Sequence, residues 1–311
     1  MLPSPHRTRQ TRAIDLHDLR RVGELVAITP EQREARRTSI GSSDIAAILG
    51  IHPSLSAADV WATKMFDVED HEHKPDWFEV GDALEPGIVQ WVADQLGQGV
   101  EQSPETIRKE PIFHANLDGR LDDGNLVEAK TGNSEGWGEP GTDEVPAHVM
   151  AQVQWQMFLA DAEITYVGAA LASDYGIRLR LYEVRRDEKI ITALRQRAVD
   201  WWETHITQHQ RPGDTPPKLE LLKRVRREPG SRVHVDEMLI EAYVQADRDQ
   251  KKANAAVKRA KAALIEAMKE GESTMSDKYE VTYLSQSRKE SVIKASTFRV
   301  LRYKRKKEVV E

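Results

Sequence analysis

Cysteine is absent from all 311 residues of the chain. Disulfide bonds, thiolate zinc sites, cysteine nucleophiles and cysteine-bound iron–sulfur clusters are therefore excluded. Long apolar runs are missing too, because no window of about 18 apolar residues could cross a bilayer. The basic N-terminus, MLPSPHRTRQTR, has no apolar stretch behind it, so we do not expect a secretory signal. These absences favour a soluble cytoplasmic protein with no membrane partner.

An overall basic character is also lacking, since the net charge is −6 at pH 7. The average conceals a segregation. Residues 288–307 contain nine Lys or Arg and one acid, so this stretch carries +8 and the other 291 residues carry −14. A local basic patch is enough to attract phosphates. The charge pattern fits a phosphate-binding segment and a solvated tail equally well.

Hydrophobic periodicity and turn residues predict an α/β order of elements: helix, strands, helix, strands, helix. We expect, in turn, loop–helix–loop over 39–61, a charged loop at 68–75, a helix over 82–96, a strand pair over 112–130 around a turn at 122–124, a glycine-rich loop at 132–141, a helix over 146–160, strands at 164–171 and 177–184, and a helix over 187–209.

Beyond this core the composition changes. The string RPGDTPPK at 211–218 is typical of a linker, and a helix is expected over 236–270. Apolar and small residues recur there every seven positions, so the helix carries a heptad-like, alanine-rich seam about 52 Å long that must pack on something. We therefore expect an arm at 1–35, a core at 36–210, a linker at 211–235 and a helical and basic region at 236–311.

The strongest candidate site is the acid–acid–lysine set in NLDGRLDDGNLVEAK. Glu128 and Lys130 alternate on a strand and share one face, and the turn at 122–124 returns Asp118 alongside them. Two converging carboxylates repel each other unless a cation joins them, and hard oxygen ligands suit Mg²⁺ or Mn²⁺. Such a site could hydrolyse a phosphodiester. A surface hairpin with a Glu–Lys pair would have the same pattern.

Three further segments each allow two interpretations. Glu85 in VGDALEPGIVQWV is either a further acid or the second half of a capping box begun by Asp82. Gln154 in MAQVQWQMF lies on an apolar helix face, either near the site or bonded to backbone in the core, whereas Gln152 has more polar neighbours. The segment RRTSIGSSD either holds a phosphate at a helix start or simply caps that helix.

One more pattern is the pair His71 and His73, which form H-x-H in a polar loop. Without a third ligand, a solvated loop is favoured over a metal site.

Together and in this order, the segments resemble the phage lambda exonuclease and YqaJ-type viral recombinase family of the PD-(D/E)xK nuclease superfamily. The matching strings are RRTSIGSSDIAAILG, VGDALEP, LDGRLDDGNLVEAK and HVMAQVQWQMF, within about residues 36–160, with weaker likeness through Ile206. The fold implied is a restriction-endonuclease-like core, a mixed sheet flanked by helices. One departure is that the acid of the first strand, Asp118, has no adjacent proline.

The resemblance also implies residue roles. Asp118 and Glu128 would bind two divalent ions with the Ala129 carbonyl, and Lys130 would help to activate the attacking water. Three positions outside this set complete the implied site: Glu85 as a further catalytic acid, Gln154 (or Gln152) as a supporting residue, and Arg36 with Ser43 near a pocket for the DNA 5′-phosphate.

The implied reaction is digestion of one strand of linear duplex DNA, from the 5′ end, in a phage-infected bacterial cell. The product would be a 3′ overhang for a single-strand annealing protein, and a homo-trimer is the implied assembly. Two other functions stay open on the residues alone: a related metal-dependent endonuclease, or a DNA-binding or assembly protein that keeps the fold without the activity.

Overall fold

The computed structural model describes residues 30–69, 76–102, 106–173 and 176–287. Two compact units divide the chain, Met1–Arg226 and Arg227–Glu311, with their boundary inside the expected linker. The basic run at 288–307, most of the expected N-terminal arm and the H-x-H pair lie outside the described residues. Within the described part, no helix is long and apolar enough to span a bilayer.

The first unit follows the predicted order of groups: helices, strands, a helix, strands and helices. Its helices are α2 (Pro30–Thr38), α3 (Ser42–Ile48), α4 (Ala57–Met65), α5 (Asp76–Leu96), α6 (Ala147–Ala160), α7 (Glu188–Trp201), continued by the π-helix η1 (Trp202–Thr207), and α8 (Leu219–Lys223). Its strands are β1 (Val100–Gln102), β2 (Ile107–Arg108), β3 (His114–Ala115), β4 (Gly119–Leu121), β5 (Leu126–Asn133), β6 (Ile164–Ser173) and β7 (Gly176–Arg185).

A five-stranded mixed sheet forms the centre of this unit, in the order β1-β4-β5-β6-β7. Strands β5 and β6 pair in parallel, and α6 makes the crossover between them, whereas the neighbouring pairs are antiparallel. The turn between β4 and β5 contains Gly124 at φ 86°, a conformation that favours glycine. The expected α/β fold, a mixed sheet flanked by helices, is confirmed.

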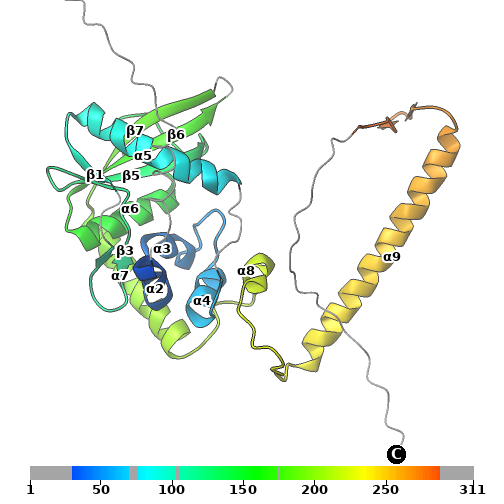
Figure 1. Ribbon diagram of the computed structural model, residues 1–311, viewed down its shortest axis with the longest axis horizontal. Helices are drawn as coiled ribbons and strands as arrows, with labels where there is room; N and C mark the ends of the chain where they lie inside the picture. The colour runs from blue at the N-terminus through cyan, green and yellow to red at the C-terminus, as the bar shows by residue number, and fades with distance from the viewer. Residues whose placement is uncertain (1–29, 70–75, 103–105, 174–175, 288–311) are drawn as a thin grey trace, which may run out of the picture. The chain divides into compact units, whose positions relative to one another are not determined.

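Helices cover both faces of the sheet, and β5 contributes to both layers (Figure 1). Val127 packs with Val89 and Val92 of α5, so the odd-numbered residues of β5 face α5. Leu126 packs in the larger core formed with α3, α6 and α7. Glu128 and Lys130 therefore face α6, because alternate residues of a strand share a face.

Helix α5 begins six residues earlier than predicted, at Asp76 rather than Asp82. The segment WFEVG at 77–81 contains no proline, and its single glycine does not stop the helix. Asp82 is therefore inside the helix and not its N-cap, so the capping-box interpretation of Glu85 is wrong. Pro86 also lies inside α5.

Three short helices were not expected from the sequence: α2, which crosses the boundary predicted between the arm and the core at residue 35, α4 and α8. Helix α4 falls in a segment predicted as loop, and its start is a capping box: Ser56 Oγ accepts from the Asp59 N–H, and Asp59 Oδ2 accepts from the Ser56 N–H. Helix α8 lies within the expected linker. Its Leu221 is 7% exposed, and Lys218 N–H before it donates to Asp59 Oδ1 at 2.7 Å, so this part of the linker packs on the first unit.

The second unit consists of the long helix α9 (Glu237–Met268), capped by Asp236, and the hairpin of β8 (Ser273–Met275) and β9 (Glu280–Thr282). No residue of α9 is buried. Among the seam residues, Leu239 and Val257 are 68% and 66% exposed. Within the described residues, the predicted seam is therefore uncovered.

Candidate active site

Asp118 and Glu128 are brought together at the centre of the sheet, as the sequence predicts. Asp118 directly precedes β4, and its Oδ2 accepts the Ala129 N–H at 2.8 Å, which holds the carboxyl group against β5. Glu128 lies on β5 and is 1% exposed. Burial raises the pKa of Asp118, and the nearby charge of Glu128 raises it further, in agreement with the closeness of the two acids.

The carboxylate of Glu128 is held by three donors. Lys130 Nζ pairs with Oε1 from the same strand face. Two glutamine side chains reach down from α6: Gln152 Nε2 donates to Oε1 at 2.5 Å, and Gln156 Nε2 donates to Oε2 at 2.7 Å. These bonds satisfy a charge that would otherwise be costly to bury.

Acidic groups outnumber basic groups at the site. Burial, together with the charges of Glu128 and Glu85, raises the pKa of Asp118 well above its ordinary value. Burial also disfavours the charge on Lys130, but the Glu128 and Asp118 carboxylates outweigh it and raise the pKa of Lys130. The ammonium group therefore remains charged, and one cation stands among three acids.

Glu85 approaches the site from α5, on the other face of β5. It lines a cavity of about 170 Å³ with Ala129 and Thr131 of β5 and with Asp82 and Phe78 of its own helix. Its charge raises the pKa values of both Asp118 and Lys130, so it lies within electrostatic range of both. This placement agrees with the predicted position of a further acid.

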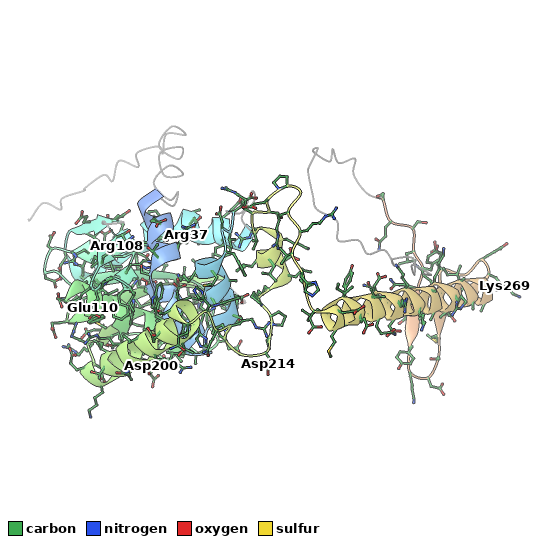
Figure 2. The ribbon with its side chains drawn as sticks, turned by 90° about the horizontal axis from the view of Figure 1, so that it is seen from below. Arg37, Arg108, Glu110, Asp200, Asp214 and Lys269 are labelled. Atoms are coloured by element: carbon green, nitrogen blue, oxygen red, sulfur yellow. The ribbon has the colours of Figure 1, made fainter. Side chains whose placement is uncertain are left out.

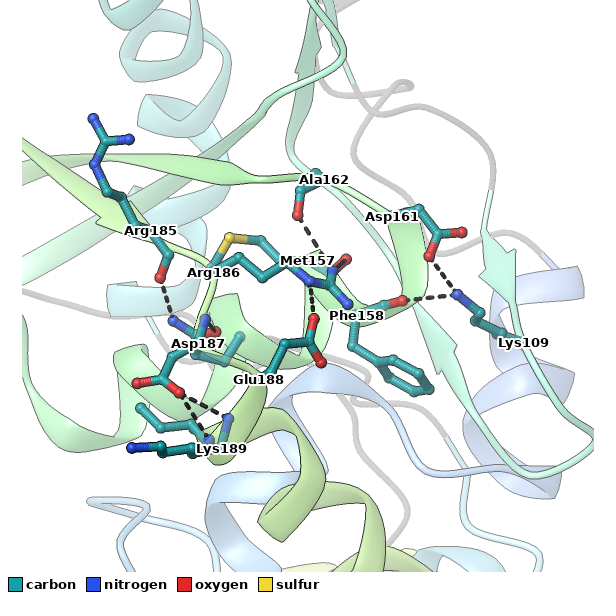
Figure 3. Close-up of polar contacts among 12 residues, drawn as sticks. Lys109, Met157, Phe158, Asp161, Ala162, Arg185, Arg186, Asp187, Glu188 and Lys189 are labelled. Carbon is teal, nitrogen blue, oxygen red and sulfur yellow. Dashed lines mark hydrogen bonds and ion pairs between the residues drawn. The ribbon is translucent and has the colours of Figure 1, made fainter.

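Gln154 is not brought to the acids. It is 1% exposed, its Nε2 donates to the Arg185 carbonyl at 2.7 Å, and its Oε1 accepts from the Asp187 N–H at 2.9 Å. Figure 3 shows Arg185 and Asp187 at the junction of β7 and α7. Gln154 therefore ties that junction to α6, and the glutamines at the acids are Gln152 and Gln156.

The segment of Arg36 and Ser43 forms a second polar region, at the end of α2 and the start of α3. Lys64 of α4 joins the two, because its ammonium group contacts the Arg36 carbonyl and the Asp44 carboxylate. Burial alone would raise the pKa of Asp44, but Lys64 and the Gly41 N–H lower it. The side chains of Arg36 and Ser43 are exposed.

A buried histidine, His114, lies beneath this region. Ser39 Oγ donates to the Ala35 carbonyl, so the contact of 2.9 Å between Ser39 Oγ and His114 Nδ1 is a bond donated by the imidazole. Burial lowers the pKa of His114 to about 4 despite the opposing charge of Asp44, and the nearby cations Lys64, Arg36 and Arg108 add to the effect. Figure 2 labels Arg37 and Arg108 on the same side of the first unit.

His114 predicts a specific loss of stability in acid. Its pKa is about 4 in the fold against 6.5 for the free side chain, so below pH 6.5 the unfolded chain takes up a proton that the folded chain does not. We expect the unfolding free energy to fall by up to ~3 kcal/mol between about pH 6.5 and 4. The variant His114→Gln should have a flatter profile in urea titrations over this range. Identical slopes of unfolding free energy against pH for both proteins would contradict the assignment of this acid-dependent loss to His114.

The donor set at Asp118 and Glu128 fits a hard divalent cation such as Mg²⁺ or Mn²⁺. Burial raises the pKa of Asp118, and the negative charges of Glu128 and Glu85 raise it further; a bound cation would relieve that repulsion. Within the described residues, no three His, Asp or Glu side chains are grouped closely enough to hold an ion. The side-chain ligands that fit are thus the carboxylates of Asp118 and Glu128.

Sequence reasoning missed two parts of the site. His148, Gln152 and Gln156 recur every fourth residue on α6, a spacing that places them in one row, but the glutamines predicted near the site are Gln154 and Gln152. His52, in the loop after α3, belongs to no motif that the sequence predicts. Its ring lies 6.1 Å from the His148 ring, between centroids.

Comparison with known proteins supports the resemblance found in the sequence. Residues 32–163, which contain all four strings, match the YqaJ-like viral recombinase domain. The uncharacterized protein YqaJ of Bacillus subtilis (strain 168) is 23% identical over 181 residues, covering 57% of this chain and 56% of that protein. The chain thus spans about half the length of this relative.

Solved structures of exonucleases are also similar to the chain. LHK-Exo, an alkaline exonuclease from Laribacter hongkongensis solved in complex with dAMP, is 18% identical with a TM-score of 0.47, covering 58% of this chain and 94% of that one. A phage related exonuclease from Haemophilus somnus 129PT is 14% identical with a TM-score of 0.44, covering 57% and 99%.

Proposed function

We propose that this chain, whose residues 32–163 carry a YqaJ-like viral recombinase domain, is a metal-dependent exonuclease that digests one strand of linear duplex DNA from its 5′ end. The observation that carries the proposal is the meeting of Asp118, Glu128 and Lys130 on one face of the sheet, where burial and mutual repulsion raise the pKa of Asp118. Such a set favours phosphodiester hydrolysis over simple DNA binding, because a non-enzymatic protein has no need to gather these charges.

Each residue has a distinct task in this proposal. Asp118, Glu128 and the Ala129 carbonyl would hold Mg²⁺ or Mn²⁺, two ions in all, with Glu85 as a further acid. Bound metal would supply Lewis acidity to the scissile phosphate and a more acidic water. Lys130 would orient the attacking water and stabilise negative charge on the phosphate. Gln152 and Gln156, rather than Gln154, would keep the Glu128 carboxylate in position.

The 5′-phosphate of the digested strand would bind at the end of α2 and the start of α3. Exposed Arg36 offers a guanidinium group, and exposed Ser43 offers a hydroxyl group. The negative charge of Asp44 is compensated by Lys64 at 2.7 Å, so it does not repel an anion there. A pocket for a terminal phosphate favours an exonuclease over a related endonuclease.

The wider role proposed is recombination by strand annealing, in which the 3′ overhang is passed to a single-strand annealing protein. The uncovered seam of α9 supports self-association, with a trimer as the proposed assembly. The C-terminal region, including the basic run at 288–307, would serve assembly or retention of DNA and not the chemistry.

The test compares three substrates of one sequence: linear duplex with 5′-phosphates, linear duplex with 5′-hydroxyls, and a closed circle. We expect Mg²⁺-dependent release of mononucleotides from the linear substrates, faster with the phosphate, and no cutting of the circle. Arg36→Ala and Ser43→Ala should reduce the ratio of the phosphate and hydroxyl rates, because each removes an anion contact. Arg195→Ala, at an exposed ion pair with Glu110, is the matched control and should keep the wild-type ratio.

Two results would overturn parts of this proposal. Cutting of the closed circle would identify an endonuclease instead. Equal rates of digestion by the wild-type protein on both linear substrates would contradict the 5′-phosphate pocket, but they would not contradict the exonuclease activity.

A further inference from the structure

A pair of histidines lies beside the acids without a role in the chemistry described above. His148 is in the first turn of α6, and its row on that helix continues with Gln152 and Gln156, both of which bond Glu128. The row therefore runs over the strand face of Glu128 and Lys130, with His148 one turn beyond the glutamines. The charge of Lys130 acts on His148, in agreement with this placement.

His52 faces His148 from the loop after α3. The two rings are tilted at 57° with their centroids 6.1 Å apart. His52 Nδ1 accepts the Leu55 N–H at 2.8 Å and the Ser54 N–H at 3.1 Å. Because Nδ1 is an acceptor, the proton of the neutral ring is on Nε2, and the two backbone bonds fix the ring orientation.

Most of the charges that act on this pair are positive. Lys130 and Lys218 act on His52, and burial, His148 and these two lysines together lower its pKa despite the opposing charge of Asp44. Burial and Lys130 lower the pKa of His148 as well. Helix α6 begins at Ala147, after the N-cap Pro146, with no acid in its first turn and no side-chain cap, so the N–H groups of that turn add positive potential near His148. Neutral imidazole N–H groups in a positive setting are suited to an anion.

We propose that His52 and His148 form a binding site for a backbone phosphate of the DNA strand, between the α2–α3 region and the acids. This inference rests on the proposed function and adds two positioning residues to it. His52 lies in the loop after α3, and the His148 ring beside it lies on the α6 row that bonds Glu128, so the pair connects the two regions. The imidazoles would fix how far the strand advances past Lys130.

A contact to a backbone phosphate is made before and during the reaction, so its loss should weaken binding more than turnover. We expect His148→Ala and His52→Ala each to raise KM for 5′-phosphorylated linear duplex about tenfold, with kcat changed less than threefold, in line with the loss of one bond to a charged group. His148→Gln retains an N–H donor and should recover most of the affinity. His209→Asn is the control, because His209 is exposed and asparagine tolerates its φ of 56°.

A direct measurement of DNA binding tests the histidine site independently of cleavage. The Kd for the same duplex, measured by fluorescence anisotropy in EDTA, should rise about tenfold in both alanine variants, and the imidazole NMR signals of His52 and His148 should shift on adding DNA. Unchanged Kd and KM in both folded variants, or a fall confined to kcat, would overturn the proposed site. Absence of cleavage by the wild-type protein would instead overturn the proposed exonuclease activity. The ratio of the Kd values of the alanine variants and the wild type would still show whether the two histidines bind DNA.

Discussion

Asp118→Asn should lower the rate of Mg²⁺-dependent digestion by about a thousandfold or more while leaving the protein at least as stable as the wild type. The loss follows because a ligand of the metal is removed, and several kcal/mol of transition-state stabilisation correspond to factors of this size. The stability follows because the amide oxygen of the substituted side chain can still accept the Ala129 N–H, as the Asp118 carboxylate does. Removing a buried charge that Glu128 and Glu85 repel favours the fold.

The measurement pairs initial rates on 5′-phosphorylated linear duplex with urea unfolding in EDTA. Asp123→Asn is the matched control, since Asp123 is exposed in the turn between β4 and β5 and bonds Asn125 and Gln98. It should digest DNA within a factor of about two of wild type, a change of well under 1 kcal/mol in the barrier. A folded Asp118→Asn protein that digests DNA at the wild-type rate would remove Asp118 from the active site.

The sequence predicts the features of the fold and the site that depend on local contacts better than those that depend on contacts between distant segments. The β4–β5 turn and the shared face of Glu128 and Lys130 are local, because strand alternation and a glycine at positive φ determine them. The approach of Glu85 from α5 was predicted by resemblance, although its distance along the chain from β5 leaves no periodic pattern between them. The α/β order of the core was also readable, since each of its longer elements has a clear period.

The features that sequence reasoning missed depend on tertiary contacts. Gln154 and Gln156 are both glutamines on α6, and both are 1% exposed, so residue type and burial do not distinguish them. What separates them is which element lies opposite: the β7–α7 junction for Gln154 and Glu128 for Gln156. The pairing of His52 with His148 joins a loop and a helix far apart in sequence, and no local spacing reports it.

Lys130→Met should both abolish digestion and destabilise the metal-free fold by several kcal/mol. Glu128 is 1% exposed, and without Lys130 its carboxylate would keep only the two glutamine donors. Removing one partner of a buried ion pair leaves an uncompensated charge and costs about 3–5 kcal/mol. By contrast, Arg185→Met, which removes an exposed ion pair with Glu183 at 2.5 Å, should cost no more than ~1 kcal/mol.

A double variant distinguishes charge compensation from packing. In Lys130→Met combined with Glu128→Gln, the buried charge is gone, so most of the lost stability should return while digestion stays abolished, because neither the ligand nor the ammonium group is restored. Urea unfolding of the wild type, both single variants and the double variant gives the coupling free energy directly. A coupling near zero would mean that Lys130 stabilises the site through the packing of its aliphatic stem. Full stability of Lys130→Met alone would mean that Gln152 and Gln156 suffice to hold the Glu128 carboxylate, and that the lysine is retained for the reaction only.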